Sequence, residues 1–229
     1  MNKVFFVHVQ RTGGTSLRTM LETFHGGQGV HPSSQYLERA PSRRYQTLGE
    51  LLSAWDRLPS HRFLFGHYLA AAVDLLPAGY ATATFLRHPI DRSISILQLH
   101  AHLNGRPVSS LVSDDQFLTS HVSDLQTRVF GTELDHGPVR PQEAPVADDN
   151  TLQRAIERLS TFRLVGFTED FERSIAAFDA EFGTLLAGRT RRVNTAPKGD
   201  VDRTELVRIV DPLVERDLEL YRQARQLSK

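Results

Sequence analysis

A short turn near the start of the chain carries residues suited to binding an anion. Gly13 and Gly14 let backbone N–H groups approach a ligand closely, because glycine has no Cβ and accepts unusual φ values. Arg11 precedes them with a fixed positive charge. The turn also carries three hydroxyl donors: Thr12, Thr15 and Ser16. This combination favours phosphate binding over an ordinary connection between two elements.

The elements on either side of this turn would position it. Residues 4–9 are an apolar run rich in β-branched and aromatic residues, which is typical of a buried strand. After the turn, apolar residues recur at the spacing of one helix face: Leu17, Met20, Leu21 and Phe24. A helix that begins here directs its free N–H groups and the positive end of its dipole at an anion.

The turn lacks the parts of a loop that hydrolyses nucleoside triphosphates. Such a loop has the pattern G-x-x-x-x-G-K-[ST], in which the lysine contacts the β- and γ-phosphates and the hydroxyl binds magnesium. Here Thr15 follows Gly14, and Val9 stands where the pattern has its first glycine. The sequence therefore predicts a phosphate loop that does not hydrolyse ATP.

The composition narrows the class of protein. With 229 residues, 40% of them hydrophobic and 24% charged, one α/β domain over residues 1–229 is expected. Lysine plus arginine and aspartate plus glutamate both number 27, so the zero net charge does not predict nucleic-acid binding. The absence of cysteine excludes disulfides and a cysteine nucleophile. No apolar run is long enough to span a membrane and there is no room for a signal peptide, so a cytoplasmic protein is expected.

Predicted strands alternate with predicted helices along the rest of the chain. Further strands are expected at residues 63–68, 81–86 and 162–167. Helices are expected over residues 47–55, 69–76, 114–130, 152–159 and 171–182, from Pro89 onward, and at the C-terminus, where Asp211-Pro212 would restart or kink the helix. This alternation predicts a parallel sheet covered on both faces, with ligands at the carboxyl ends of its strands. The irregular segments 26–45 and 100–150 are expected to frame the substrate.

A second segment that could do chemistry reads Phe85-Leu86-Arg87-His88-Pro89-Ile90-Asp91-Arg92-Ser93-Ile94-Ser95. Arg87 would follow the end of a strand, and Ser95 would lie about two turns into the next helix. Taken alone, Arg87 is most simply a solvated charge or the partner of a carboxylate such as Asp91.

Taken together, the segments VHVQRTGGTSL and FLRHPIDRSIS resemble the two nucleotide-binding signatures of sulfotransferases that use 3′-phosphoadenosine 5′-phosphosulfate (PAPS). The carbohydrate type, similar to heparan sulfate 2-O-sulfotransferase, is the most similar. Phe65-Gly66-His67-Tyr68 resembles the Gly-His motif of this family, and segments 125–128, 165–169 and 194–199 also resemble parts of it. The resemblance implies a three-layer, P-loop-like fold with a central parallel sheet flanked by helices.

The resemblance also implies a role for each motif residue. The 5′-phosphosulfate would be held by the first motif: Arg11, Thr12, Gly13, Gly14, Thr15, Ser16 and Leu17. Arg87 and Ser95 would bind the 3′-phosphate, which suits the chemistry of a guanidinium, because its N–H donors match phosphate oxygens in pairs. A late basic loop would close over this phosphate with one of three cations: Arg191, Arg192 or Lys198. Thr168 would lie beside the adenine.

His67 is the candidate general base, because it follows an apolar strand at the edge of the sheet where the site is expected. A neutral imidazole can take the proton of an acceptor hydroxyl as its oxygen attacks sulfur. His8, inside the first predicted strand, is a second candidate, and other histidines or carboxylates stay open. Arg11 stands where many relatives have lysine. Since arginine keeps its proton, it would act electrostatically on the departing phosphate.

The sequence thus predicts an enzyme that transfers a sulfuryl group from PAPS to a hydroxyl and releases adenosine 3′,5′-bisphosphate. The acceptor would be a small molecule, a lipid or a carbohydrate, and nothing in the sequence indicates an oligomeric state. No metal is expected, because the acidic pairs at 114–115 and 148–149 are interpreted as loop or cap charges. Two alternatives stay open: a kinase-like phosphotransferase, for which the loop lysine and a magnesium carboxylate are missing, and a nucleotide-binding domain without catalysis.

Overall fold

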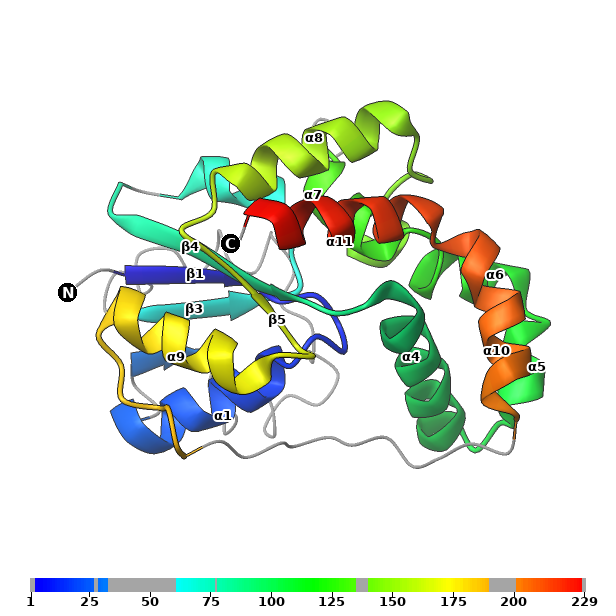
Figure 1. The fold of residues 1–229 in the computed structure, drawn as a ribbon, viewed down its shortest axis with the longest axis horizontal. Helices are drawn as coiled ribbons and strands as arrows, with labels where there is room; N and C mark the ends of the chain where they lie inside the picture. The colour runs from blue at the N-terminus through cyan, green and yellow to red at the C-terminus, as the bar shows by residue number, and fades with distance from the viewer. Residues whose placement is uncertain are drawn as a thin grey trace.

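The computed structural model describes residues 3–26, 29–32, 61–76, 78–134, 140–189 and 201–227. Within these ranges, five strands form one sheet in the order β2-β3-β1-β4-β5 (Figure 1). The strands are β1 (Lys3–Val7), β2 (Val30–His31), β3 (Phe63–Gly66), β4 (Tyr80–Leu86) and β5 (Leu164–Phe167). Each neighbouring pair is parallel, which confirms the expected sheet. The edge strand β2 was not predicted, because two residues are too few for a periodic pattern.

Helices connect and cover these strands. The α-helices are α1 (Gly14–His25), α4 (Pro89–Asn104), α5 (Val108–Val112), α6 (Asp115–His121), α7 (Leu125–Gly131), α8 (Asp149–Ser160), α9 (Phe171–Phe182), α10 (Arg203–Val210) and α11 (Glu215–Leu227). The described ranges also contain the short 3₁₀ helices η4 (Ala70–Leu75), η6 (Pro141–Glu143) and η7 (Asp211–Leu213). In the described part of the chain, no helix is both long enough and apolar enough to cross a membrane.

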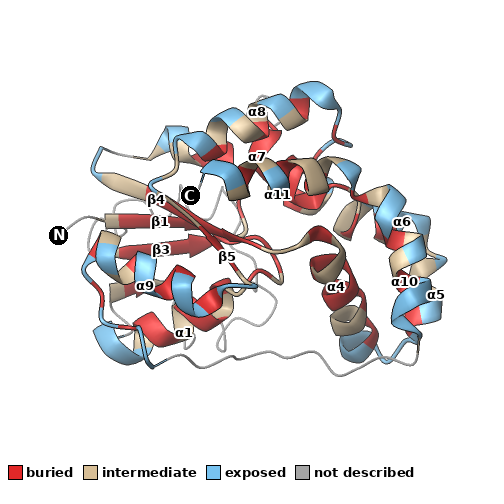
Figure 2. Cartoon of the chain, viewed as in Figure 1, coloured by how far each residue is buried: buried red, intermediate tan, exposed pale blue. Residues whose placement is uncertain are grey.

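Strand β1 shows how the sheet is packed between two layers of helices. Val4 and Phe6 belong to an apolar cluster with residues of α1 and α9. Phe5 and Val7 point to the opposite face and pack with residues of α7, α8 and α11. All four side chains are fully buried, as the red strands of Figure 2 show. Side chains of a strand alternate between its faces, so both faces are covered and the three-layer arrangement is confirmed.

The side of the sheet to which strands are added changes at β1. The chain adds β3 on one side of β1 and then β4 on the other, so Val7 pairs with both Gly66 and Thr84. In an open parallel sheet, ligands bind at the carboxyl ends of the strands where the order reverses in this way. The residues that follow β1, β3 and β4 therefore occupy the favoured position for a site.

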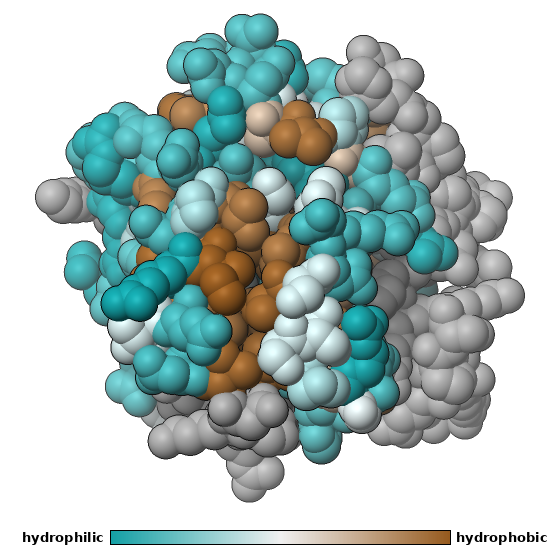
Figure 3. All heavy atoms as spheres, turned by 90° about the vertical axis from the view of Figure 1, so that its right-hand side faces the viewer, coloured by the Kyte–Doolittle hydropathy of each residue, from teal (hydrophilic) through white to brown (hydrophobic). Residues whose placement is uncertain are grey.

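A third apolar cluster lies beside the sheet and is formed by helices. It joins residues of α4, α5, α6 and α10, among them Leu97, Leu111 and Val210. Figure 3 shows this side of the molecule, where apolar side chains gather in the middle and polar ones surround them. The expected irregular segment 100–150 thus contributes several short helices to this side.

The predicted helix over residues 114–130 is wrong as a single element, because it is divided into α6 and α7. Asp124 interrupts it with a left-handed φ of 44°. Its carboxylate accepts hydrogen bonds from the backbone N–H groups of Arg216 and Asp217, both at 3.0 Å, at the start of α11. A contact with a distant helix thus overrides the local pattern, which a sequence window does not reveal.

Other local expectations are confirmed. Asp114 and Asp148 cap α6 and α8, accepting the N–H groups of Phe117 at 3.0 Å and Thr151 at 2.7 Å. Asp211-Pro212 ends α10 and, through η7, restarts the chain as α11. The predicted helix over residues 47–55 lies outside the described residues.

Candidate functional site

The carboxyl edge of the sheet collects the residues that the sequence marks as functional. His8 and the loop to Gly13 follow β1, and His67 follows β3. Arg87 follows β4, and Thr168 follows β5. Because these strands are parallel neighbours, the four segments emerge from the same edge.

The loop between β1 and α1 bends through two residues with positive φ. Gly13 has φ 87° and Arg11 has φ 69°. This region is uncommon for a residue with a side chain, and such residues occur where the surrounding structure holds them for a function. Helix α1 begins at Gly14, and within the described loop no side chain caps it. The first N–H groups of α1 are therefore directed at the mouth of the loop without a capping side chain.

Two members of the predicted cradle support the loop from inside. The hydroxyl of Thr12 is buried and donates to the carbonyl oxygen of Val9 at 2.9 Å. Leu17 is fully buried in the cluster between the sheet and α1, and its N–H donates to the Gly13 carbonyl oxygen at 3.2 Å. Thr15 is half-buried at the loop surface, whereas Ser16 is buried. Packing decides which of these side chains point into the protein and which lie at the loop surface, so the motif alone does not predict it.

The two sequence motifs are in direct contact. The Nε of Arg11 donates a hydrogen bond to the Ser95 Oγ at 2.9 Å, across 84 positions of sequence. The Nη1 of Arg87 donates to the carbonyl oxygen of Arg11 at 3.3 Å. Ser95 lies on the buried face of α4, and Arg87 lies just before that helix. Arg11, Arg87 and Ser95 therefore form one cluster that carries two guanidinium groups.

Neighbouring side chains fix the main chain around this cluster. Gln126 forms hydrogen bonds with both the N–H and the carbonyl oxygen of Arg87. The Thr168 hydroxyl donates to two carbonyl oxygens, those of Thr12 at 2.8 Å and Leu86 at 3.1 Å. Thr168 thus ties the loop to the ends of β4 and β5. The segment 125–128 was noted in the sequence, but no role was predicted for Gln126 itself, because a single glutamine carries no distinctive pattern.

Two histidine rings are stacked beside the loop. The ring centroids of His8 and His67 are 4.3 Å apart, with 28° between their planes. The pKa of His67 is lowered to about 4. Burial is the largest cause, a hydrogen bond with the His8 backbone acts in the opposite direction, and the nearby Arg18 cation lowers the pKa as well. Burial also lowers the pKa of His8 well below its usual value, and His67, Arg18 and Arg11 lower it further. Both imidazoles are therefore neutral at pH 7 and able to accept a proton.

Arg18 is a member of the site that the sequence analysis missed. It lies on α1, one turn after Gly14, and its charge acts on both histidines. Its Nε is 3.7 Å from the Glu22 carboxylate, and burial lowers the pKa of its guanidinium. Its spacing from the glycines was a usable signal, since residues four apart lie on the same helix face.

Gly14 is the residue that allows His8 to lie beneath the loop. A Cβ at this position would come within 2.6 Å of the His8 Nε2. We expect Gly14→Ala to displace the imidazole and lower the free energy of unfolding by about 1–3 kcal/mol, the usual cost of overpacking. Gly29→Ala is the matched control, because among the described residues a Cβ there meets only the His25 Cβ at 3.8 Å. Urea unfolding measures both variants, and equal stability of the two would contradict this interpretation of Gly14.

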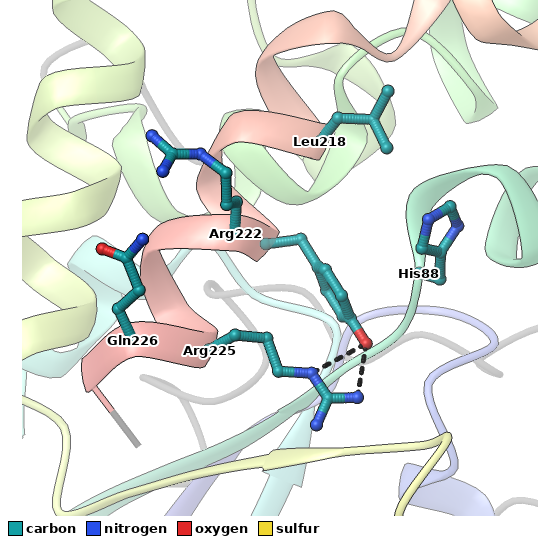
Figure 4. A pocket seen from close by; sticks show the side chains of 6 residues that line it. His88, Leu218, Arg222, Arg225 and Gln226 are labelled. Carbon is teal, nitrogen blue, oxygen red and sulfur yellow. Dashed lines mark hydrogen bonds between the residues drawn. The ribbon is translucent and has the colours of Figure 1, made fainter. Parts of the chain in front are cut away.

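A surface hollow of about 420 Å³ lies between α11 and His88, the residue that follows Arg87 at the start of α4 (Figure 4). Its lining residues are His88, Leu218, Tyr221, Arg222, Arg225 and Gln226. Arg222 pairs with Glu219 at 2.6 Å, and Arg225 donates to the Tyr221 hydroxyl at 2.8 Å and pairs with Asp170. Since these cations are already paired within the protein, we interpret the hollow as part of the contact between α11 and the start of α4.

Part of the predicted nucleotide and acceptor site falls on residues that the structure does not describe. Arg191, Arg192 and Lys198 lie outside the described residues, as does most of the segment 26–45. Among the residues that are described, no three acidic or histidine side chains come together in a way that could hold a metal ion.

Comparisons with known proteins add little. No protein-family model matches the chain, and no curated protein matches it. Among solved structures, the chain is similar to a sulfotransferase from Alicyclobacillus acidocaldarius, with 17% sequence identity, coverage of 96% of both chains and a TM-score of 0.49. We therefore base the interpretation of the site on the contacts described above and not on this similarity.

Proposed function

We propose that the protein is a sulfotransferase that moves the sulfuryl group of PAPS to an acceptor hydroxyl. The observation that carries the proposal is the contact between the two motifs, in which Arg11 bonds to Ser95 and Arg87 bonds to the Arg11 backbone. Guanidinium groups and helix N–H groups from two distant segments converge there. A ligand with two separate anionic groups suits this arrangement, and a nucleotide charged at both its 5′ and 3′ positions is such a ligand.

In this proposal the loop at residues 11–16 binds the 5′-phosphosulfate through the first N–H groups of α1 and the charge of Arg11. Arg11 stabilises the negative charge that develops on the departing phosphate. Ser95 accepts a hydrogen bond from Arg11 through its oxygen, so its own hydroxyl hydrogen can donate to the 3′-phosphate. Arg87 supplies a planar set of N–H donors to the same phosphate. Thr168 would lie beside the adenine.

His67 acts as the general base in this scheme. It takes the proton of the acceptor hydroxyl while the acceptor oxygen forms its new bond to sulfur. The bond between sulfur and the bridging oxygen breaks, and adenosine 3′,5′-bisphosphate leaves with that oxygen. His67 is half-buried, whereas His8 is buried against Gly14 beneath the loop. His67 is therefore the more exposed of the two imidazoles, and we assign it as the base.

The pH dependence of the reaction is expected to differ between kcat/KM for PAPS and kcat. In the protein without ligand the pKa of His67 is lowered to about 4, mainly by burial and in part by the charge of Arg18. Activity falls as the pH drops through this pKa, because protonation removes the base. A bound polyanion offsets the charge of Arg18 and stabilises the imidazolium, so the pKa rises in the complex.

Measurements of initial rate against pH report these two pKa values separately, since kcat/KM reflects the free enzyme and kcat the complex. The acid limb of kcat should lie at higher pH than the acid limb of kcat/KM. An acid limb of kcat at the same or lower pH would contradict this electrostatic account.

The proposed reaction is tested by incubating the protein with ³⁵S-labelled PAPS and a panel of small-molecule, lipid and carbohydrate hydroxyl acceptors. The expected result is label on an acceptor, together with adenosine 3′,5′-bisphosphate in equal amount. Label found only in free sulfate with every acceptor, or no consumption of PAPS, would count against transfer. Phosphorylation of the same acceptors by ATP and magnesium would favour a phosphotransferase instead.

A further inference from the structure

Gln126 holds the main chain of Arg87 through both of its backbone groups. The Arg87 N–H donates to the Gln126 Oε1 at 3.1 Å, and the Gln126 Nε2 donates to the Arg87 carbonyl oxygen at 3.0 Å. Gln126 is only 1% exposed, so water does not take its place. Strand β4 ends at Leu86, and the side-chain amide supplies the pairing that the sheet no longer gives to the next residue.

A primary amide is the side-chain group that suits this position. It presents one acceptor and one donor side by side, which matches the N–H and carbonyl of one residue. An ionised carboxylate offers acceptors alone, and a thioether or alkyl chain leaves both backbone groups without these hydrogen bonds. Arg87 therefore depends on the chemistry of Gln126 as well as on its size.

Gln126 is itself held by the C-terminal helix. The Asp217 carboxylate of α11 accepts the backbone N–H of Gln126 at 3.1 Å and that of Thr127 at 2.6 Å. Asp124, just before α7, accepts the N–H groups of Arg216 and Asp217 in return. Each carboxylate thus caps the helix of the other, and both Asp217 and Gln126 are buried. This reciprocal pair fixes the start of α7, from which the Gln126 side chain reaches Arg87.

We propose that Gln126 is a positioning residue that gives the site its specificity for a 3′-phosphate. It holds the Arg87 main chain so that the guanidinium can meet the 3′-phosphate while it contacts the Arg11 carbonyl oxygen. The inference rests on the proposed function, because it concerns the same nucleotide. The next residue, His88, is held through its N–H by Glu169 at 2.8 Å, but Glu169 is exposed and water can replace it. The buried contact is therefore the one that sets the position of Arg87.

The test compares a nucleotide that has a 3′-phosphate with one that lacks it. Calorimetry gives the dissociation constants of adenosine 3′,5′-bisphosphate and adenosine 5′-monophosphate for the wild-type protein and for Gln126→Met. The bisphosphate should bind at least about tenfold more weakly to the variant, as expected when buried hydrogen bonds that orient a charged group are lost. Binding of the monophosphate should be almost unchanged, because it needs only the loop at residues 11–16.

Two further variants separate positioning from a general effect on folding. Thr127→Val changes the next residue of α7, whose fully buried hydroxyl has no hydrogen-bond partner among the residues described, so both nucleotides should bind as to the wild type. Gln126→Glu keeps an acceptor for the Arg87 N–H but loses the donor and adds a negative charge. It should weaken the bisphosphate more than Gln126→Met does, and it provides the measurement if Gln126→Met does not fold.

The outcomes distinguish this inference from the proposed function. If the wild-type protein itself shows no preference for the bisphosphate, the proposed function and the inference both fail. If the wild type shows the preference and the Gln126 variants keep it, the inference alone fails. Equal weakening of both nucleotides also overturns it, because that result reveals a structural role without specificity for the 3′-phosphate.

Discussion

Replacing His67 with asparagine is expected to lower kcat by about 10²–10⁴-fold, the usual contribution of a general base. Asparagine is polar and similar in size, but it cannot take a proton at neutral pH. The affinity for adenosine 3′,5′-bisphosphate should change little, because the loop and Arg87 would bind the nucleotide. A steady-state transfer assay gives kcat, and calorimetry gives the affinity.

His102→Asn is the matched control for this replacement. His102 is an exposed histidine in the last turn of α4, so its loss should leave both constants unchanged. The decisive comparison is between the two histidine variants at saturating acceptor. Transfer by His67→Asn at close to the wild-type rate would show that another group removes the proton.

Replacing Arg87 with alanine is expected to weaken adenosine 3′,5′-bisphosphate by roughly 10²-fold. Two charge-assisted hydrogen bonds to the 3′-phosphate would be lost, at about 1.5 kcal/mol or more each. Adenosine 5′-monophosphate has no phosphate at this position, so its affinity should be nearly constant. Arg87→Lys should recover only part of the loss, because an ammonium cannot bind two phosphate oxygens in the fork geometry of a guanidinium.

Arg222→Ala controls for the loss of a positive charge near the site. Arg222 lines the hollow beside the start of α4, is exposed and pairs with Glu219. Its removal should leave both nucleotide affinities unchanged, because surface pairs of this kind contribute little. If Arg87→Ala weakened the two nucleotides equally, Arg87 would not be the residue that contacts the 3′-phosphate.

The sheet and the glycine loop between β1 and α1 were predictable because their signals are local. The apolar run before the loop, the two glycines and the helical spacing after them all lie within about twenty residues, and the structure has β1, the loop and α1 there. His67 and Arg87 were also placed correctly at strand ends, since each follows a short apolar run. For parallel strands, a position just after a strand determines the edge of the sheet.

The features that were missed depend on contacts between distant segments. Gln126 reaches Arg87 across 39 positions, and Asp124 breaks a helix in order to cap α11 across more than 90. No window of sequence contains both partners of either contact. Thr12 and Leu17 match the motif, but in the folded loop the Thr12 hydroxyl and the Leu17 side chain both point into the protein. Which atoms of a motif face the ligand is decided by tertiary structure.

The central claim is that two distant segments bind the two ends of one nucleotide. Calorimetry with the wild-type protein tests it most directly, by comparing adenosine 3′,5′-bisphosphate, adenosine 5′-monophosphate and ATP with magnesium under the same conditions. The account predicts that the bisphosphate binds roughly 10²-fold more tightly than the monophosphate, the contribution of the 3′-phosphate contacts, and also more tightly than ATP with magnesium. Tighter binding of ATP with magnesium, or equal binding of the bisphosphate and the monophosphate, would contradict it.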